Sequence, residues 1–261
     1  MLHMHNWPVL VLSLPDCVAR RAPLLAQLAD AGIPHEVVPA LDGRAGLPAE
    51  AEARIDRQAA QRRMGRPLRD AEFACALSHL GIYRLIAERG LSGAVILEDD
   101  AVLLPGFAAF LAAGAHRDAP LLQFCYGSAR VMRGGARQAI PGVVTRELAL
   151  PAALTVAYSV SAPVAAALLQ AGMPVCATAD WPCDTTRLGA RVVVPMLVHH
   201  PGPVAVTSTI GGARRARDLG LPDPKRRLSR FATRDYWRRW WRKRGSFWLP
   251  PDPGFAGPSV P

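Results

Sequence analysis

The sequence predicts an α/β fold in which helices cover a largely parallel sheet. Two observations lead to this prediction. The first 40 residues show a strand-helix-strand order, which favours parallel strands joined by a helix. A later apolar strand, Gly93–Leu97, runs directly into three carboxylates. Half of the 261 residues are hydrophobic, so the chain can bury a core and its body is not intrinsically disordered.

The opening unit is defined by three segments. Pro8–Leu14 is a continuous apolar run, typical of a strand buried on both faces. Residues 20–31 carry leucines at helical spacing, and Gly32 is suited to end that helix. His35–Val38 resumes extended structure before the turn at 41–43.

The middle of the chain alternates between weak and strong signals. Residues 44–69 are polar and weakly helical, and we expect a surface excursion there. Asp70–Arg89 has one apolar stripe and predicts a helix. Leu121–Tyr126 predicts a strand, whereas the Gly- and Arg-containing residues 127–147 predict a loop.

The segment Leu148–Ala179 contains no charged residue and is long enough to cross a bilayer as a helix. Its three prolines, its hydroxyl groups and its many alanines argue against that interpretation. We therefore expect a buried strand at Leu154–Ser161 and a helix at Pro163–Ala171. A last strand is predicted at Arg191–Val198.

The positive charge is concentrated near the C-terminus. The chain has 31 Lys+Arg and 21 Asp+Glu, and residues 213–245 hold 13 of the basic groups against three acidic ones. We therefore divide the chain into a neutral domain at 1–212 and a basic, Trp-rich, partly helical tail at 213–261. Five cysteines, an odd number without C-x-x-C or metal-site spacing, predict buried thiols in a reducing compartment. The short run Pro8–Leu14, with no basic residue before it, does not predict a secretory signal.

The tail predicts an amphipathic helix. Four tryptophans fall within about 100° of helical arc, and basic residues occupy much of the opposite side. These tryptophans are Trp237, Trp240, Trp241 and Trp248. Such a helix suits an anionic membrane surface, contacted through residues 213–248. The alternatives are that the Trp stripe packs back onto the domain or that the tail is disordered.

Glu98-Asp99-Asp100 is the strongest candidate for chemistry. Three adjacent carboxylates repel one another, so burial at a strand end calls for a compensating cation. A hard divalent ion such as Mg²⁺ or Mn²⁺ supplies it and shares its remaining positions with phosphate oxygens. The alternative is a solvated acidic turn.

Three further groups are candidates. Glu72 and His79 lie seven residues apart on one predicted helix, within about 20° of each other, and could face a cleft; a solvent-facing Glu and a hydrogen-bonded His are the alternative. Asp180 or Asp184 could act as a general base or cap a turn. His199-His200 point to opposite faces of a strand, so we favour a structural role for the pair.

Several familiar patterns are missing from the sequence. It contains no G-x-G-x-x-G, P-loop, G-x-S-x-G or H-E-x-x-H motif. Dinucleotide-binding, P-loop and serine hydrolase functions are therefore not expected.

Taken in order, the segments resemble glycosyltransferase family 25, which includes bacterial lipooligosaccharide galactosyltransferases and collagen galactosyltransferases. Glu72 to His79 looks like the family's E-x-x-C-x-x-S-H segment, and Ile96–Asp100 looks like its acidic motif. The other matching stretches are Val9–Leu14 with Arg20-Arg21, Pro39–Gly43, Thr155–Ser161, Asp180 and Ser208–Ile210.

The resemblance implies a GT-A-like, Rossmann-type nucleotide-sugar-binding domain. It implies transfer of a hexose, galactose or glucose, from a UDP-sugar with inversion. The acceptor would be a hydroxyl of a cell-surface glycan such as the lipooligosaccharide or LPS core, or of a lipid-linked oligosaccharide. We expect the protein to be cytoplasmic, attached peripherally to the inner face of the bacterial inner membrane.

The resemblance and the residue chemistry together suggest roles. Mn²⁺ or Mg²⁺ would be held by Asp100 with Glu98, which alternate on an extended chain, or with Asp99. Arg20 or Arg21 would contact uridine or diphosphate oxygens. Asp180, or as second choice Asp184, would accept the acceptor's proton. The side chains expected to line the donor or acceptor cleft are those of Asp42, Glu72, Ser78 and His79.

Three rival functions remain. A nucleic-acid-binding protein would explain the basic tail but not the acidic motif, and nucleic acid is not an expected partner. An inactive transferase-like scaffold would keep the fold without turnover. A metal-dependent phosphohydrolase should carry more His and Asp ligands than this sequence offers.

Overall fold

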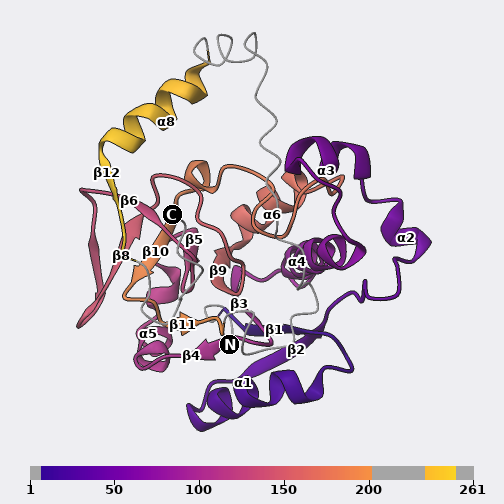
Figure 1. Cartoon of the computed structure of the whole chain (residues 1–261). Helices are drawn as coiled ribbons and strands as arrows, with labels where there is room; N and C mark the ends of the chain where they lie inside the picture. The colour runs from indigo at the N-terminus through magenta and orange to yellow at the C-terminus, as the bar shows by residue number, and fades with distance from the viewer. Residues whose placement is uncertain (1–6, 202–232, 251–261) are drawn as a thin grey trace.

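The computed structural model describes residues 7–201 and 233–250. Its centre is an eight-stranded sheet in the order β2-β1-β3-β9-β5-β10-β8-β7, flanked by helices (Figure 1). The strands of this sheet are β1 (Val9–Ser13), β2 (His35–Pro39), β3 (Gly93–Glu98), β5 (Leu121–Gln123), β7 (Arg137–Ile140), β8 (Val143–Glu147), β9 (Ala157–Ser161) and β10 (Ala190–Val194). Two small ladders pair β11 (Val198–His199) with β4 (Val102–Leu103) and β12 (Ser246–Trp248) with β6 (Arg130–Met132).

The described helices flank the sheet and fill its connections. They are α1 (Val18–Asp30), α2 (Ala49–Glu52), α3 (Arg57–Met64), α4 (Asp70–Glu88), α5 (Phe107–Ala112), α6 (Ala162–Ala171) and α8 (Arg234–Arg244), with 3-10 turns η1 (Ala115–Arg117) and η2 (Thr185–Leu188).

The sheet is mixed, with most strands running in one direction. β2, β1 and β3 are parallel neighbours, and β10 is parallel to β5. β9 runs antiparallel between β3 and β5, and β8 runs antiparallel to β10 and β7. The α/β prediction is confirmed, and the parallel β2-β1-β3 group brings the ends of β1 and β3 to the same edge of the sheet.

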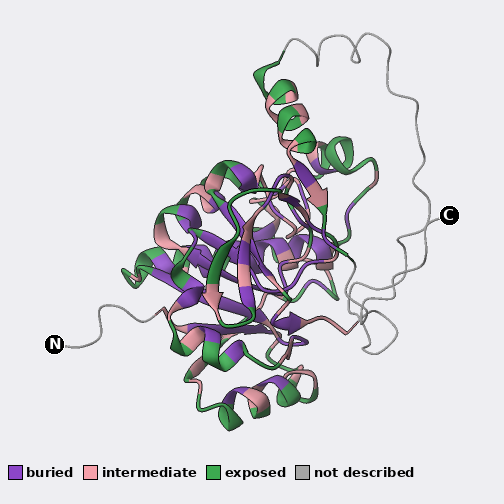
Figure 2. Ribbon diagram, turned by 90° about the vertical axis from the view of Figure 1, so that its left-hand side faces the viewer, coloured by how far each residue is buried: buried purple, intermediate pink, exposed green. Residues whose placement is uncertain are grey.

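Two apolar layers explain the continuous hydrophobic runs of the strands. Leu10 and Ile96 pack with α4 and α6 on one face, and Val11 and Leu97 pack with α1 and α5 on the other. Successive side chains of a strand point to opposite faces, so a strand covered on both sides must be apolar at every position. Figure 2 shows the resulting buried strands inside a shell of partly exposed helices.

The predicted loop at 127–147 is wrong, because this segment forms β6, β7 and β8. Its strands are short and carry exposed polar positions, so they show no apolar run. Pairing partners distant in sequence stabilise them: β8 pairs with β10, and β6 pairs with β12. Local composition does not report such long-range pairing.

The other predicted elements are confirmed with altered ends. Residues 44–69 contain α2 and α3, and the Asp56 carboxylate caps α3 by accepting the Ala59 N–H at 2.7 Å. The predicted strand Leu121–Tyr126 ends at Gln123, and Arg191–Val198 is divided into β10 and β11. The charge-free segment Leu148–Ala179 holds β9 and α6, as expected. Within the described parts of the chain, no helix is both long and apolar enough to cross a bilayer.

The described part of the tail packs against the domain. β12 pairs antiparallel with β6, and α8 stands at the edge of the molecule (Figure 1). Arg242 Nη2 lies 2.7 Å from Glu147 Oε1, and Arg238 Nη2 lies 2.5 Å from Asp184 Oδ2. Arg238 and Arg242, on the basic side of α8, therefore face the domain, whereas Lys243 and Arg244 are exposed. The predicted boundary at 212 and the Ser208–Ile210 segment lie outside the described residues.

The tryptophans of α8 and β12 do not pack into the domain. Trp237, Trp241 and Trp248 are 48%, 64% and 55% exposed. Trp237, Trp240 and Trp241 contact one another edge to face, and Arg244 lies 4.1 Å from the centre of the Trp240 ring. Three of the four tryptophans are thus largely exposed, which argues against packing of the whole stripe onto the domain, although β12 pairs with β6 and Arg130 lies 5.7 Å from the centre of the Trp248 ring.

Candidate active site

The acidic motif begins at the end of β3. Glu98 is the last residue of the strand, and the Ala101 N–H donates to the Glu98 carbonyl at 3.0 Å, which closes a turn through Asp99 and Asp100. The alternation expected of an extended chain therefore stops at Glu98. Alternation along a strand therefore does not place the Glu98 and Asp100 side chains on the same side. Their positions depend on the groups around them.

Arg20 is the cation nearest Asp99 and Asp100. Its Nε lies 3.0 Å from Asp99 Oδ1 as an ion pair rather than a hydrogen bond, and its Nη2 donates to Asp100 Oδ2. Ser13 Oγ donates to Asp99 Oδ2 at 2.8 Å. Burial raises the pKa of Asp99 even so, although Arg20 and Ser13 act to lower it. One guanidinium thus only partly offsets the burial of these carboxylates.

Asp100 retains an uncompensated oxygen. It is 9% exposed, and its Oδ1 atom is buried without a hydrogen-bond partner among the described residues. His200 Nε2 lies 3.6 Å from Asp100 Oδ2, and His200 Nδ1 is also buried without a described partner. A buried acceptor without a donor is costly, so these atoms mark a place suited to a cation. Sequence reasoning favoured a structural role for the His pair and missed His200.

Glu98 is held by a different set of groups. Its Oε1 lies 3.2 Å from His79 Nε2 and accepts from Thr155 Oγ1 at 3.1 Å. Burial alone would raise the pKa of Glu98, but the hydrogen bond and charge of His79 outweigh it and lower the pKa. His79 Nδ1 in turn lies 2.9 Å from the Tyr158 hydroxyl, which donates to the Tyr83 hydroxyl at 3.0 Å. His79 is therefore hydrogen-bonded, and it also lines a hollow, so both features expected of it are present.

Asp180 is tied to the same region by neighbouring residues. Leu154 N–H donates to Asp180 Oδ1 at 3.0 Å, and the next residue, Thr155, donates to Glu98. Leu154 and Trp181 have φ angles of 82° and 124°, in the left-handed region that side chains rarely adopt. Backbone strain of this kind persists where the surrounding structure enforces it, often at active sites.

Asp184 lies in a different environment, against the tail helix. Its Oδ1 accepts from Thr186 N–H at 3.1 Å and so caps η2, and its Oδ2 accepts from Arg238. Burial alone would raise the pKa of Asp184, but Thr186 and the Arg238 and Arg239 charges outweigh it and lower the pKa. This carboxylate is fully engaged in structural contacts.

A hollow of about 580 Å³ opens beside the acidic motif. Its lining includes Arg20, Glu98, Asp99, and the predicted residues Asp42 and Ser78. Ser78 Oγ accepts from Leu41 N–H at 2.9 Å and fixes the 41–43 turn. At Gly43 a Cβ would lie 2.6 Å from the Asp70 carbonyl oxygen, so this turn packs directly on the start of α4.

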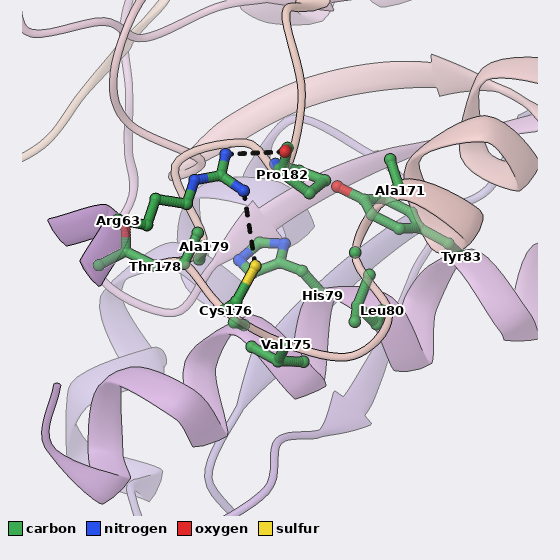
Figure 3. Close-up of a pocket in the computed structure, with 13 residues that line it drawn as sticks. Arg63, His79, Leu80, Tyr83, Ala171, Val175, Cys176, Thr178, Ala179 and Pro182 are labelled. Atoms are coloured by element: carbon green, nitrogen blue, oxygen red, sulfur yellow. Dashed lines mark hydrogen bonds between the residues drawn. The ribbon is translucent and has the colours of Figure 1, made fainter. Parts of the chain in front are cut away.

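A second hollow, of about 360 Å³, lies on the other side of α4 (Figure 3). His79, Leu80 and Tyr83 line it from α4, and Arg63 crosses its rim to donate to the Pro182 carbonyl at 2.8 Å. Its lining is mostly apolar and holds no carboxylate. The hollow beside the acidic motif is the better candidate for a charged nucleotide, because Arg20 and Arg44 line it and its carboxylates could hold a bridging dication.

Two predicted residues point elsewhere. Glu72 accepts from Arg66 and from the Arg69 N–H, which caps the start of α4, and it lines neither hollow. Arg21 donates to the carbonyls of Leu14 and Pro15. Thr155 and Tyr158 were missed as site residues, although they belong to the Thr155–Ser161 stretch that resembles the family. Cys75, inside the E-x-x-C-x-x-S-H stretch, was also missed.

The comparison with known families agrees with this geometry. Residues 6–132 match glycosyltransferase family 25 (LPS biosynthesis protein). The family 25 match covers about half of the chain and includes α4 and the acidic motif, which confirms that resemblance. It ends before Thr155 and Asp180, so it does not bear on their roles. No curated protein matches the chain.

The match supports a glycosyltransferase of LPS biosynthesis, and such an enzyme uses a sugar donor and a glycan acceptor. All five cysteines are free thiols, but only Cys125 is buried and the other four are half-buried, so the prediction of buried thiols is confirmed for Cys125 alone.

Proposed function

We propose that the protein is an inverting glycosyltransferase that moves a hexose, galactose or glucose, from a UDP-sugar to a hydroxyl of a cell-surface glycan such as the LPS core. The observation that carries the proposal is the arrangement around Leu154 and Thr155. The Leu154 N–H donates to Asp180 and the Thr155 hydroxyl donates to Glu98. Two adjacent residues therefore position a candidate base and the acidic motif.

A divalent cation would be held by Asp100 beside His200, with Glu98 as a further ligand, although these three side chains do not form a ready-made ligand cluster among the described residues. The fit rests on the buried, unpartnered Asp100 Oδ1 and His200 Nδ1 atoms and on the excess of carboxylates over cations. A carboxylate-rich donor set suits Mn²⁺ or Mg²⁺. When bound, the cation supplies neutralisation of the charge that develops on the diphosphate leaving group.

Arg20 would bind the donor beside the acidic motif. It lines the hollow, it is held in place by Asp99 and Asp100, and the ion pairs raise its pKa despite burial. A fixed guanidinium presents its remaining donors to phosphate oxygens with little loss of side-chain entropy. Asp42 and Ser78 line the same hollow and would contact the nucleoside or the sugar.

Asp180 is the proposed general base. In direct displacement the acceptor oxygen forms a bond to the anomeric carbon as the bond to the diphosphate breaks, and the hydroxyl proton goes to Asp180. Asp184 is the weaker candidate because Thr186, Arg238 and Arg239 occupy its oxygens.

The function is tested with the full chain and a panel of UDP-galactose, UDP-glucose and UDP-N-acetylhexosamines. We expect one donor to bind and to be slowly hydrolysed only with Mn²⁺ or Mg²⁺. Absence of binding and turnover with every donor and either ion contradicts the proposal.

We also propose that α8 and β12 place the enzyme on an anionic membrane surface. Trp237, Trp241 and Trp248 are exposed while the opposite, basic side of α8 is held by Asp184 and Glu147. Trp side chains favour the headgroup region, and exposed cations such as Lys243 and Arg244 add attraction to anionic lipids. The acceptor would then be a lipid-linked oligosaccharide on the cytoplasmic face of the inner membrane.

Co-sedimentation with vesicles tests the membrane proposal. The full chain should bind vesicles containing phosphatidylglycerol, and Trp237→Ser with Trp241→Ser should weaken binding at least about tenfold. Val18→Ser, an exposed apolar site on α1, is the matched control. Equal binding by the double variant and the control contradicts the proposal.

A further inference from the structure

Three side chains with metal-binding chemistry meet between α4 and β3. Cys75 and His79 lie four residues apart on α4, a spacing that places both on one face of a helix. Glu98 reaches the same point from the end of β3. One ligand atom from each of the three lies within 4.8 Å of the others. This cluster contains neither Asp100 nor His200, and Glu98 is the residue that it has in common with the proposed Mn²⁺ or Mg²⁺ ligands.

The surrounding hydrogen bonds orient the three groups. His79 Nδ1 lies 2.9 Å from the Tyr158 hydroxyl, which lies 3.0 Å from the Tyr83 hydroxyl. The Nε2 atom of His79 is thereby directed at Glu98, 3.2 Å away. Thr155 donates to the same carboxylate oxygen of Glu98. Metal-binding histidines are typically held in this way through their second ring nitrogen.

The charges of the proposed site balance once a dication is bound. A thiolate from Cys75 and the carboxylate of Glu98 offset the two positive charges of the ion, and the protons that the ion displaces go to solvent. A buried site with a net charge of zero avoids the cost of an isolated buried charge.

We propose that Cys75, His79 and Glu98 form a binding site for a thiophilic dication of the Zn²⁺ class. Thiolate and imidazole select such ions over Mg²⁺ or Mn²⁺. In a tetrahedral zinc site the ligand atoms lie roughly 3.5 Å apart. Side-chain rotations that move the ligand atoms by about 1 Å would bring the three groups to this separation. Cys75 and Glu98 both line the hollow beside the acidic motif, so the fourth position is open to solvent.

Co²⁺, which takes the place of Zn²⁺ in such sites, gives a direct test with the metal-free full chain. One equivalent should produce the near-ultraviolet charge-transfer band of a cobalt–thiolate bond. Cys75→Ser should abolish the band and lower Zn²⁺ affinity, measured against a competing chelator, by on the order of 100-fold. Cys176→Ser is the matched control: this thiol lies beside Arg63, Nη1 to Sγ 3.7 Å, and should retain both signals.

A second measurement uses the unaltered chain and so does not depend on the folding of a variant. Zn²⁺ should slow alkylation of Cys75, mapped by peptide mass, and leave Cys176 unaffected. Absence of the cobalt–thiolate band in the wild type, or an equal band in Cys75→Ser, overturns the proposal. Equal alkylation of Cys75 with and without Zn²⁺ does so as well. These readouts measure no sugar transfer, so their failure is separate from failure of the proposed transferase.

Discussion

Two carboxylates, Asp100 and Asp184, show how the same side chain can take opposite roles. Both are largely buried at a chain turn, and both contact arginine. Asp184 also accepts from Thr186 and lies near Arg239, so its charge is offset by structural partners. Asp100 shares Arg20 with Asp99 and keeps one buried oxygen without a partner. A carboxylate with several cationic partners, such as Asp184, has a structural role. A carboxylate that shares a single arginine, such as Asp100, is suited to bind a cation.

The largest effect is expected from Asp100→Asn, which removes the uncompensated charge. Transfer should fall on the order of 10³-fold, because stabilisation of developing charge at such sites contributes this much. Mn²⁺ affinity, measured by calorimetry or electron paramagnetic resonance, should fall with it. Glu147→Gln, which removes only a partner of Arg242, is the control and should leave both quantities unchanged. Normal Mn²⁺ affinity in Asp100→Asn would place the cation elsewhere.

The second-largest effect is expected from Asp180→Asn, and comparison with Asp184→Asn tests which of the two carboxylates is the general base. Asp180→Asn should lower kcat on the order of 10²-fold and leave donor affinity intact, because it removes only the proton acceptor. Asp184→Asn should lower kcat less and should loosen α8. Steady-state kinetics with saturating donor make the comparison. If Asp184→Asn loses more than Asp180→Asn, the roles assigned to the two residues are reversed.

A smaller effect is expected from Arg238→Ala, which opens the clamp between α8 and Asp184. The Arg238 side chain is 30% exposed, so the ion pair should contribute about 1 kcal/mol or less to the free energy of unfolding. Amide hydrogen exchange should nevertheless accelerate along α8, and strands β1 and β3 should stay protected. Unchanged exchange in α8 would show that β12 pairing alone holds the helix.

The smallest effect is the loss of stability that we expect at low pH when Asp184 is protonated. The pKa of Asp184 lies below its ordinary value of 3.8 in the folded protein, so its contribution to stability is complete above that pH. It is lost as the pH falls below about 3.8 and through the folded pKa, when the carboxylate is protonated. Hydrogen exchange of α8 between pH 5 and pH 3 should show this loss. Arg238→Ala should show a weaker pH response, and an identical response would assign the acid transition to another group.

Parts of the fold were predictable because they depend on local chemistry. The β1-α1-β2 unit, α4 and β3 carry uninterrupted apolar runs or stripes, and each appears where expected. The strands β6, β7 and β8 could not be predicted, because their order comes from pairing with β10 and β12. Likewise, Glu72 seemed equivalent to His79 by helical spacing, but Arg66 and the Arg69 N–H draw it away from the hollow.

The sequence by itself determined which residue types could bind a cation or a nucleotide. The acidic motif and the E-x-x-C-x-x-S-H stretch are each a continuous segment and can be recognised without the fold. It also determined that the tail has a Trp side and a basic side, because both follow from helical periodicity. Only the tertiary structure decided which carboxylates are already neutralised and which side of the tail faces the domain. Those outcomes depend on Arg20, Leu154, Thr155 and Arg238, whose contacts join residues 26 to 80 positions apart. Coulomb and hydrogen-bond energies depend on distance in space, which spacing along the chain does not report.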